Sequence, residues 1–101
     1  MEYTKNIDGD SCRIKLKGKF TFADHKEFKK VFSSISEKTF KQLTLDISEV
    51  EYIDSAALGL LLLTKEEAEK NSVSLTIYKP HQQVQKMFKI SRFYELFNVV
   101  D

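Results

Sequence analysis

The sequence predicts an α/β fold in one domain, residues 1–101, with a mixed sheet of four to five strands and helices mainly on one face. A chain of 101 residues with 42% hydrophobic and 31% charged residues has the length and composition of one globular domain. Segments with apolar residues at every second position alternate along it with segments of helical spacing. Because the strand-like segments alternate instead of being continuously apolar, we expect water on much of one sheet face.

The first 20 residues predict a hairpin of two strands. Residues 3–7 alternate weakly, and Asp8-Gly9-Asp10 follows as a turn signal, because glycine accepts a positive φ. Residues 12–16 then alternate clearly between apolar and basic side chains, and Gly18 is expected to end this strand.

A helix and a third strand follow. Apolar residues at i, i+3, i+4 and i+7 between Phe28 and Ile35 predict a helix that begins near Thr21 to Asp24. Residues 43–47 alternate again and predict the third strand.

The second half of the chain predicts two more helices and a strand. Residues 55–70 start apolar on all sides and end polar, which predicts a helix whose first half is buried. We expect Leu60 to Leu63 to be core, and Gly59 to be tolerated because the helix lies close to the sheet. Residues 73–77 predict a fourth strand, Pro80 opens a helix, and residues 93–97 form a short helical tail.

Charge and targeting signals exclude several functions. Lysine and arginine number 16 and aspartate and glutamate 15, so the net charge is +1 and no basic excess favours nucleic acid. No signal-peptide pattern opens the chain, and its longest apolar run, residues 56–63, is far shorter than a membrane span. We expect a cytoplasmic protein without direct membrane contact.

No catalytic motif is present in the sequence. His25, His81 and Cys12 are isolated from one another, so we expect no metal and no cofactor. A hydrolase elbow around Ser55 would need glycine where Ile53 and Ala57 stand, and no phosphate-binding glycine motif occurs. We therefore expect no enzyme, and a small nucleotide-binding or hydrolytic domain is the least favoured alternative.

The segment that joins the third strand to the second helix carries the most specific pattern. Asp54 and Ser55 are typical helix N-caps, because their oxygens accept hydrogen bonds from free backbone N–H groups. The strand 43–47 followed by Asp54-Ser55-x-x-Leu58-Gly59 resembles the STAS domains of anti-sigma factor antagonists and sulfate-transporter tails. The resemblance covers essentially the whole chain.

The resemblance implies that a partner kinase phosphorylates Ser55. Ala56 and Ala57 replace the Ser-Gly common in the antagonists, which removes a hydroxyl but keeps the site small. Thr21 stands where the antagonists often carry an acidic residue, and its loop lies near the phosphorylation site in the family fold. The expected partner-binding residues are Thr21, Phe22, Asp54, Ser55, Ala56 and Ala57.

The function implied by the resemblance is that of an anti-sigma factor antagonist-like regulator. It binds a partner when unphosphorylated and is released by phosphorylation of Ser55. The expected partners are an anti-sigma factor or serine-kinase protein and a PP2C-type serine phosphatase. The alternative is a STAS adaptor subunit of a lipid or solute ABC-type transporter, in which Ser55 need not be modified.

Overall fold

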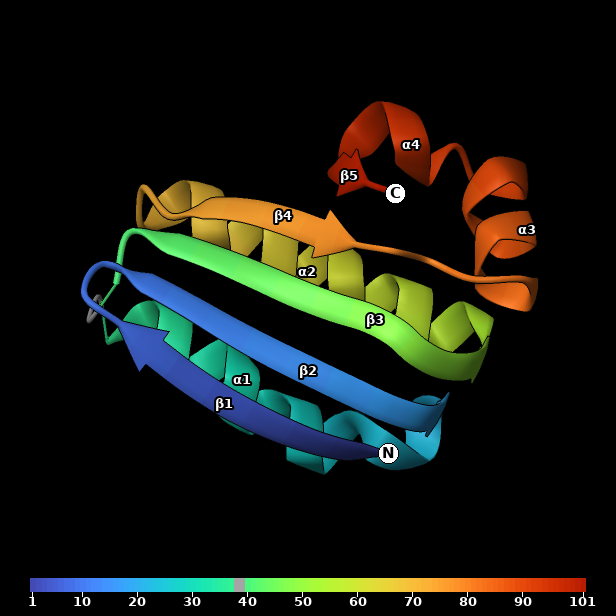
Figure 1. Ribbon diagram of the computed structural model, residues 1–101, viewed down its shortest axis with the longest axis horizontal. Coiled ribbons are helices and arrows are strands. Elements are labelled where there is room, and N and C mark those ends of the chain that lie inside the picture. Colours follow the sequence, from blue (N-terminus) through green and yellow to red (C-terminus); the bar gives the residue numbers. More distant parts are fainter. Residues whose placement is uncertain (38–39) are drawn as a thin grey trace.

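The computed structural model describes residues 1–37 and 40–101, and its centre is one five-stranded sheet (Figure 1). The strands lie in the order of the sequence: β1 (Glu2–Asp8), β2 (Ser11–Phe20), β3 (Gln42–Ile53), β4 (Ser74–Tyr78) and β5 (Asn98–Val100). β1 runs antiparallel to β2, and the other neighbours are parallel. The predicted mixed α/β sheet is confirmed.

The helices cover one face of this sheet. They are a 3₁₀ turn η1 (Phe22–Asp24), α1 (His25–Ser36), α2 (Ser55–Lys70), α3 (Gln83–Ile90) and α4 (Phe93–Leu96). α1 and α2 lie behind the sheet in Figure 1, while α3 and α4 lie beside the end of β4. The opposite face is open to water, as the alternation of the strands predicts.

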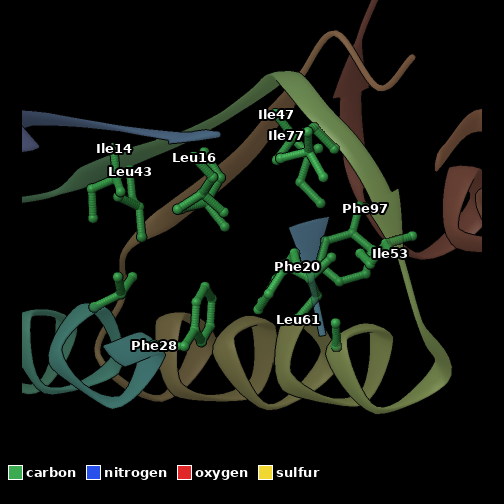
Figure 2. Packing of buried hydrophobic residues seen from close by; sticks show 14 of the residues in the cluster. Ile14, Leu16, Phe20, Phe28, Leu43, Ile47, Ile53, Leu61, Ile77 and Phe97 are labelled. Atoms are coloured by element: carbon green, nitrogen blue, oxygen red, sulfur yellow. The ribbon is translucent and has the colours of Figure 1, made fainter. Parts of the chain in front are cut away.

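The core lies between the sheet and the two long helices. Figure 2 shows apolar side chains of β2 and β3 that point from the sheet toward Phe28 of α1 and Leu61 of α2. Phe28 and Leu61 are 1% and 0% exposed. Burial of such side chains contributes about 1.5–3 kcal/mol each, and it fixes where the carboxyl ends of the strands lie.

β2 and β3 are longer than predicted, because two irregularities in their pairing reset the alternation. Lys15 pairs with Asp46, but Lys17 pairs with Glu49, and a second shift follows Gly18. Gly18 has a φ of +86° and lies inside β2, so the expectation that it ends this strand is wrong. The shifts allow β3 to continue through Ile53, directly before the segment singled out above.

The C-terminal part differs from the prediction in two places. The expected helix at Pro80 begins only at Gln83, because Lys79 and Gln82 have positive φ values of 53° and 43°. After the four-residue α4, the chain forms β5, which pairs with Thr76–Tyr78 of β4. The prediction of a short helical tail for residues 93–97 is therefore incomplete, because a strand follows the helix.

One expectation about α2 is wrong, and a second holds only in part. A Cβ added at Gly59 would meet no atom within 4 Å, so this glycine is not required by a close approach to the sheet. Of the leucines 60–63, Leu61 is buried and Leu60 and Leu62 are partly buried against the core, whereas Leu63 is 51% exposed. The reason is the helical period, which turns only one side of α2 toward the sheet.

Candidate functional site

The candidate site lies where the parallel strands end. The segment after β2 (residues 21–22), the segment after β3 (residues 54–55) and the segment after β4 (residues 79–82) all follow carboxyl ends of neighbouring strands. Parallel strands bring these ends to one edge of the sheet. In Figure 1 this is the end of the sheet at which β2 and β3 turn into the helices.

Asp54 connects the first two of these segments. Its Oδ1 accepts a hydrogen bond from Ala57 N–H at 2.8 Å, and its Oδ2 accepts one from Phe22 N–H at 3.1 Å. Its own N–H donates to the Phe20 carbonyl oxygen at 3.3 Å. Asp54 is therefore the N-cap of α2 and also holds the segment after β2 against the start of this helix.

Ser55 is the first residue of α2, and its side chain is exposed. The first N–H groups of a helix have no intrahelical partner, so the hydroxyl lies at the positive end of the helix dipole. Ala56 is exposed beside it. Ala57 is 0% exposed and belongs to the core, so the structure places this expected partner-binding residue beneath the surface that Ser55 and Ala56 form.

The two residues after β2, Thr21 and Phe22, differ in their exposure and in their contacts. Thr21 is half-buried, and its N–H donates to Asp24 Oδ2 at 2.9 Å. Phe22 is 60% exposed and stacks on His25, with ring centroids 4.7 Å apart. His25 Nδ1 also donates to the Phe22 carbonyl oxygen at 2.9 Å. His25 therefore contacts both the ring and the backbone of Phe22, and this fixed, exposed ring favours contact with another molecule.

Asp24 stabilises the turn that carries Phe22. Burial raises the pKa of Asp24, but the hydrogen bond from Thr21 and the nearby amino group of Met1 outweigh this and lower it. The amino group of Met1 lies 2.9 Å from Asp24 Oδ1. The carboxylate is thus kept charged, where it can accept both hydrogen bonds.

Gln83 is a site residue that the sequence analysis missed. Its Oε1 accepts from Ile53 N–H at 3.0 Å, and its Nε2 donates to the Ile53 carbonyl oxygen at 3.1 Å. β4 ends before this point, so the amide of Gln83 replaces the neighbouring strand for the residue directly before Asp54. The one signal for Gln83 in the sequence is that it is a polar residue near the start of a predicted helix. Such residues are common, so this signal does not single out Gln83.

Residues 1–37 and 40–101 contain no group of three or more His, Cys, Asp or Glu side chains placed to hold a metal ion. In open α/β sheets, small ligands bind where the strand order reverses, and the described strands follow one another without reversal. Among the described residues, no helix is both long and apolar enough to cross a bilayer.

Fold and site together define a small α/β domain that presents a serine at a helix start. The family model described as "Mlab, STAS domain" matches residues 3–100, and the chain therefore belongs to the STAS domain family. A STAS-domain containing protein of Pseudomonas aeruginosa is 29% identical over 94 residues, which cover 93% of this chain and 92% of that protein.

Solved structures share the fold. The anti-sigma factor antagonist SpoIIAA, whose phosphorylated form is described as a Bacillus cell fate determinant, is similar in both its forms. The unphosphorylated form has a TM-score of 0.77 at 16% identity over 99% of this chain and 88% of that chain. For the phosphorylated form the TM-score is 0.76 at 16% identity, over 99% of this chain and 92% of that one.

A sulfate transporter family protein from Wolinella succinogenes has a TM-score of 0.81 at 23% identity, over 96% of this chain and 81% of that chain. The same fold therefore occurs in an anti-sigma factor antagonist and in a member of a sulfate transporter family. Fold alone does not choose between these functions, and the choice depends on the site.

Proposed function

We propose that this chain is a cytoplasmic regulatory protein of the anti-sigma factor antagonist type, without catalytic activity of its own. When unphosphorylated, it binds an anti-sigma factor or serine-kinase protein through the surface around Ser55. Phosphorylation of Ser55 releases this partner, and a PP2C-type phosphatase restores binding. The observation that carries the proposal is the exposed hydroxyl of Ser55 at the first position of α2.

The position of Ser55 makes a phosphate compatible with the fold. A phosphoserine carries about −1.5 to −2 charges at neutral pH. Free N–H groups and the dipole at the start of a helix stabilise such an anion. Asp54 lies beside it, but its carboxylate is held by Ala57 and Phe22 and cannot swing into the serine. We therefore expect phosphorylation to leave the domain folded.

The same phosphate opposes a partner that covers Ser55. A tightly packed interface would have to bury an unpaired dianion next to the carboxylate of Asp54, which costs several kcal/mol. Changing a complex from 99% bound to 99% free requires about 5.5 kcal/mol. Charge and steric bulk together are of that order, so one modification is sufficient for a switch.

The first test is the intact mass of the protein from its own host, with and without treatment by a PP2C-type phosphatase. We expect a phosphatase-sensitive gain of one phosphate that maps to Ser55. Ser55→Asp should bind the recovered kinase partner at least about tenfold more weakly, which corresponds to about 1.4 kcal/mol, at an unchanged melting temperature. Ser33→Ala, which alters an exposed serine of α1, is the matched control. Wild-type affinity of Ser55→Asp for the partner would refute the switch.

A transporter adaptor is the second candidate. It is favoured by the "Mlab, STAS domain" family model and by the similarity to a sulfate transporter family protein. In that function the surface around Ser55 contacts an ATPase permanently. Co-purification of an ATPase with a chain that stays unphosphorylated under growth and stress would support the adaptor and contradict the switch.

A further inference from the structure

An apolar groove runs between α1 and α2 on the side of these helices that faces away from the sheet. Its volume is about 140 Å³, and its walls are Phe28 and Phe32 of α1 and Leu60 and Leu63 of α2, with His25 and Lys29 at the rim. Phe28 is buried, whereas Leu63 is 51% exposed, so the groove has a closed floor and an open mouth.

The groove begins at the candidate site. Phe22 stacks on His25 at this end, and the N–H of Phe22 is bound by the carboxylate of Asp54 that caps α2. At the other end, Ser36 Oγ donates to Glu67 Oε1 at 2.7 Å and joins the two helices. The lining of the groove ends at Phe32 and Leu63, so the groove follows the first two turns of α1 and has Phe22 beside its entrance.

Its exposed apolar side chains gather in one place. Single exposed leucines are normal on protein surfaces, but contiguous apolar patches mark interaction sites. Here the exposed ring of Phe22 adjoins a groove walled by Phe32, Leu60 and Leu63. The ring is also stacked on His25, which binds the backbone carbonyl of Phe22 as well, and such a pre-positioned ring is suited to be an aromatic anchor at a protein interface.

We propose that this groove receives an amphipathic helix of the partner protein, with acidic residues beside its apolar face. The proposal rests on the proposed function for the identity of this partner, which is the protein that docks over Ser55. The occupant is a helix because α1 and α2 satisfy their own backbone groups and offer no edge to an extended segment, whereas a helix brings its hydrogen bonds with it.

The positive charge at the rim of the groove favours a partner helix with acidic residues on both sides of its apolar face. Lys29 lies at the rim and Lys26 lies one turn before it on α1; both are exposed, and neither forms an ion pair within residues 1–37 and 40–101. From His25 to Phe32 the groove wall is about 10 Å long, which corresponds to about two turns of a partner helix. Apolar anchors at i, i+3 or i+4 and i+7 match that length.

The test uses a designed probe instead of the natural partner. A 14-residue capped peptide with leucine at i, i+3, i+4 and i+7 and glutamate at the flanks is titrated into ¹⁵N-labelled protein. Its twin carries lysine in place of glutamate. We expect amide shifts in α1 and in residues 60–63, with affinity for the acidic peptide at least about fivefold higher and falling with salt.

Two leucine variants locate the binding. Leu63→Gln should weaken the acidic peptide at least about tenfold, whereas Leu96→Gln, at a leucine of α4 that is 46% exposed, should not change it. Circular dichroism checks that both variants fold. Equal binding of the two peptides, shifts outside the groove, or equal effects of the two variants would overturn the proposal.

Binding of the whole partner protein distinguishes the groove proposal from the proposed phosphorylation switch. Ser55→Asp should bind the peptide like the wild type and yet lose the partner. If Leu63→Gln keeps full affinity for the partner while Ser55→Asp loses it, the groove proposal is wrong and the switch remains. If Ser55→Asp keeps the partner, the proposed switch fails, and the peptide result alone decides whether the groove binds helices.

Discussion

Asp54 uses both oxygens of its carboxylate inside the molecule, one on Ala57 and one on Phe22. At the scale of residues, this explains why an aspartate precedes the exposed serine. The same carboxylate caps α2 and positions the surface at which we propose that a partner binds. It shapes the surface around Ser55 without being freely available to a partner. Its contribution can therefore be separated from that of Ser55.

Asp54→Ala should lower the free energy of unfolding by about 1–2 kcal/mol, because the helix cap and the hydrogen bond to Phe22 are both lost. Asp54→Asn, which keeps one acceptor oxygen, should lose about half as much. Urea denaturation followed by circular dichroism measures both. Equal stability of Asp54→Ala and the wild type would contradict the assigned cap.

Local chemistry decides which site residues could be predicted from the sequence. The N-cap role of Asp54 was predicted because N-caps have a local signature directly before an apolar helix, whereas Ser55 was selected by the resemblance to the STAS antagonists. The burial of Ala57 could not be read in the same way, because the rotation of α2 over the sheet depends on the whole core. Gln83 was missed because its partner, Ile53, lies 30 residues away in the chain.

At the scale of elements, α3 is attached to the end of β3 by the amide of Gln83. The amide of Gln83 supplies the hydrogen bonds that a longer β4 would have supplied to β3. It fixes the backbone of Ile53 directly before Asp54. The first residue of α3 therefore influences the site through the backbone of Ile53.

Gln83→Ala should leave the N–H and the carbonyl of Ile53 without these partners, which costs about 1–3 kcal/mol if both are kept from water. We expect faster hydrogen exchange at the amide of Ile53, measured by nuclear magnetic resonance. Gln85→Ala, in the same helix and without a hydrogen bond from its side chain in the described residues, serves as the control. Unchanged exchange at Ile53 in Gln83→Ala would refute the positioning role.

Element prediction succeeded where periodicity was long and failed where it was short or interrupted. α1 and the body of β2 have clear periods, and the structure confirms them. β5 has only three residues after an apolar segment of helical spacing, so its pairing with β4 could be known only from the assembled sheet. The extension of β3 was hidden because its bulges break the alternation.

At the scale of the whole molecule, the open face of the sheet carries a charged side chain that is buried. Asp46 accepts hydrogen bonds from Ser48 N–H and Oγ at 3.0 and 2.7 Å, and Arg13 lies 3.0 Å from its other oxygen. Burial raises the pKa of Asp46, but the hydrogen bonds from Ser48 and Arg13 outweigh this and lower it.

The pKa shift of Asp46 makes the stability of the fold depend on acid. A carboxylate with a lowered pKa stabilises the fold above its unfolded pKa of about 3.9, and this contribution is lost as the pH falls through the folded value. Asp46→Asn should therefore be about 1–2 kcal/mol less stable at pH 7 but should lose less stability between about pH 5 and pH 2.

Thermal unfolding across this pH range tests the prediction. Asp8→Asn, at an exposed position in β1, is the control with the same change of charge. Parallel pH profiles of Asp46→Asn and the wild type would show that the ion pair on the open face does not couple folding to protons.

The direction of the strands also decides where a reporter group can be attached. The amino terminus lies at the carboxyl ends of β2 and β3, where the amino group of Met1 contacts Asp24, so a tag at this end crowds the partner surface (Figure 1). The turn at Gly9 lies at the far end of β2, about 30 Å away. Cys12 is buried with a raised thiol pKa, so a new cysteine at Asp10 would be the thiol that a dye or a sensor surface reaches first.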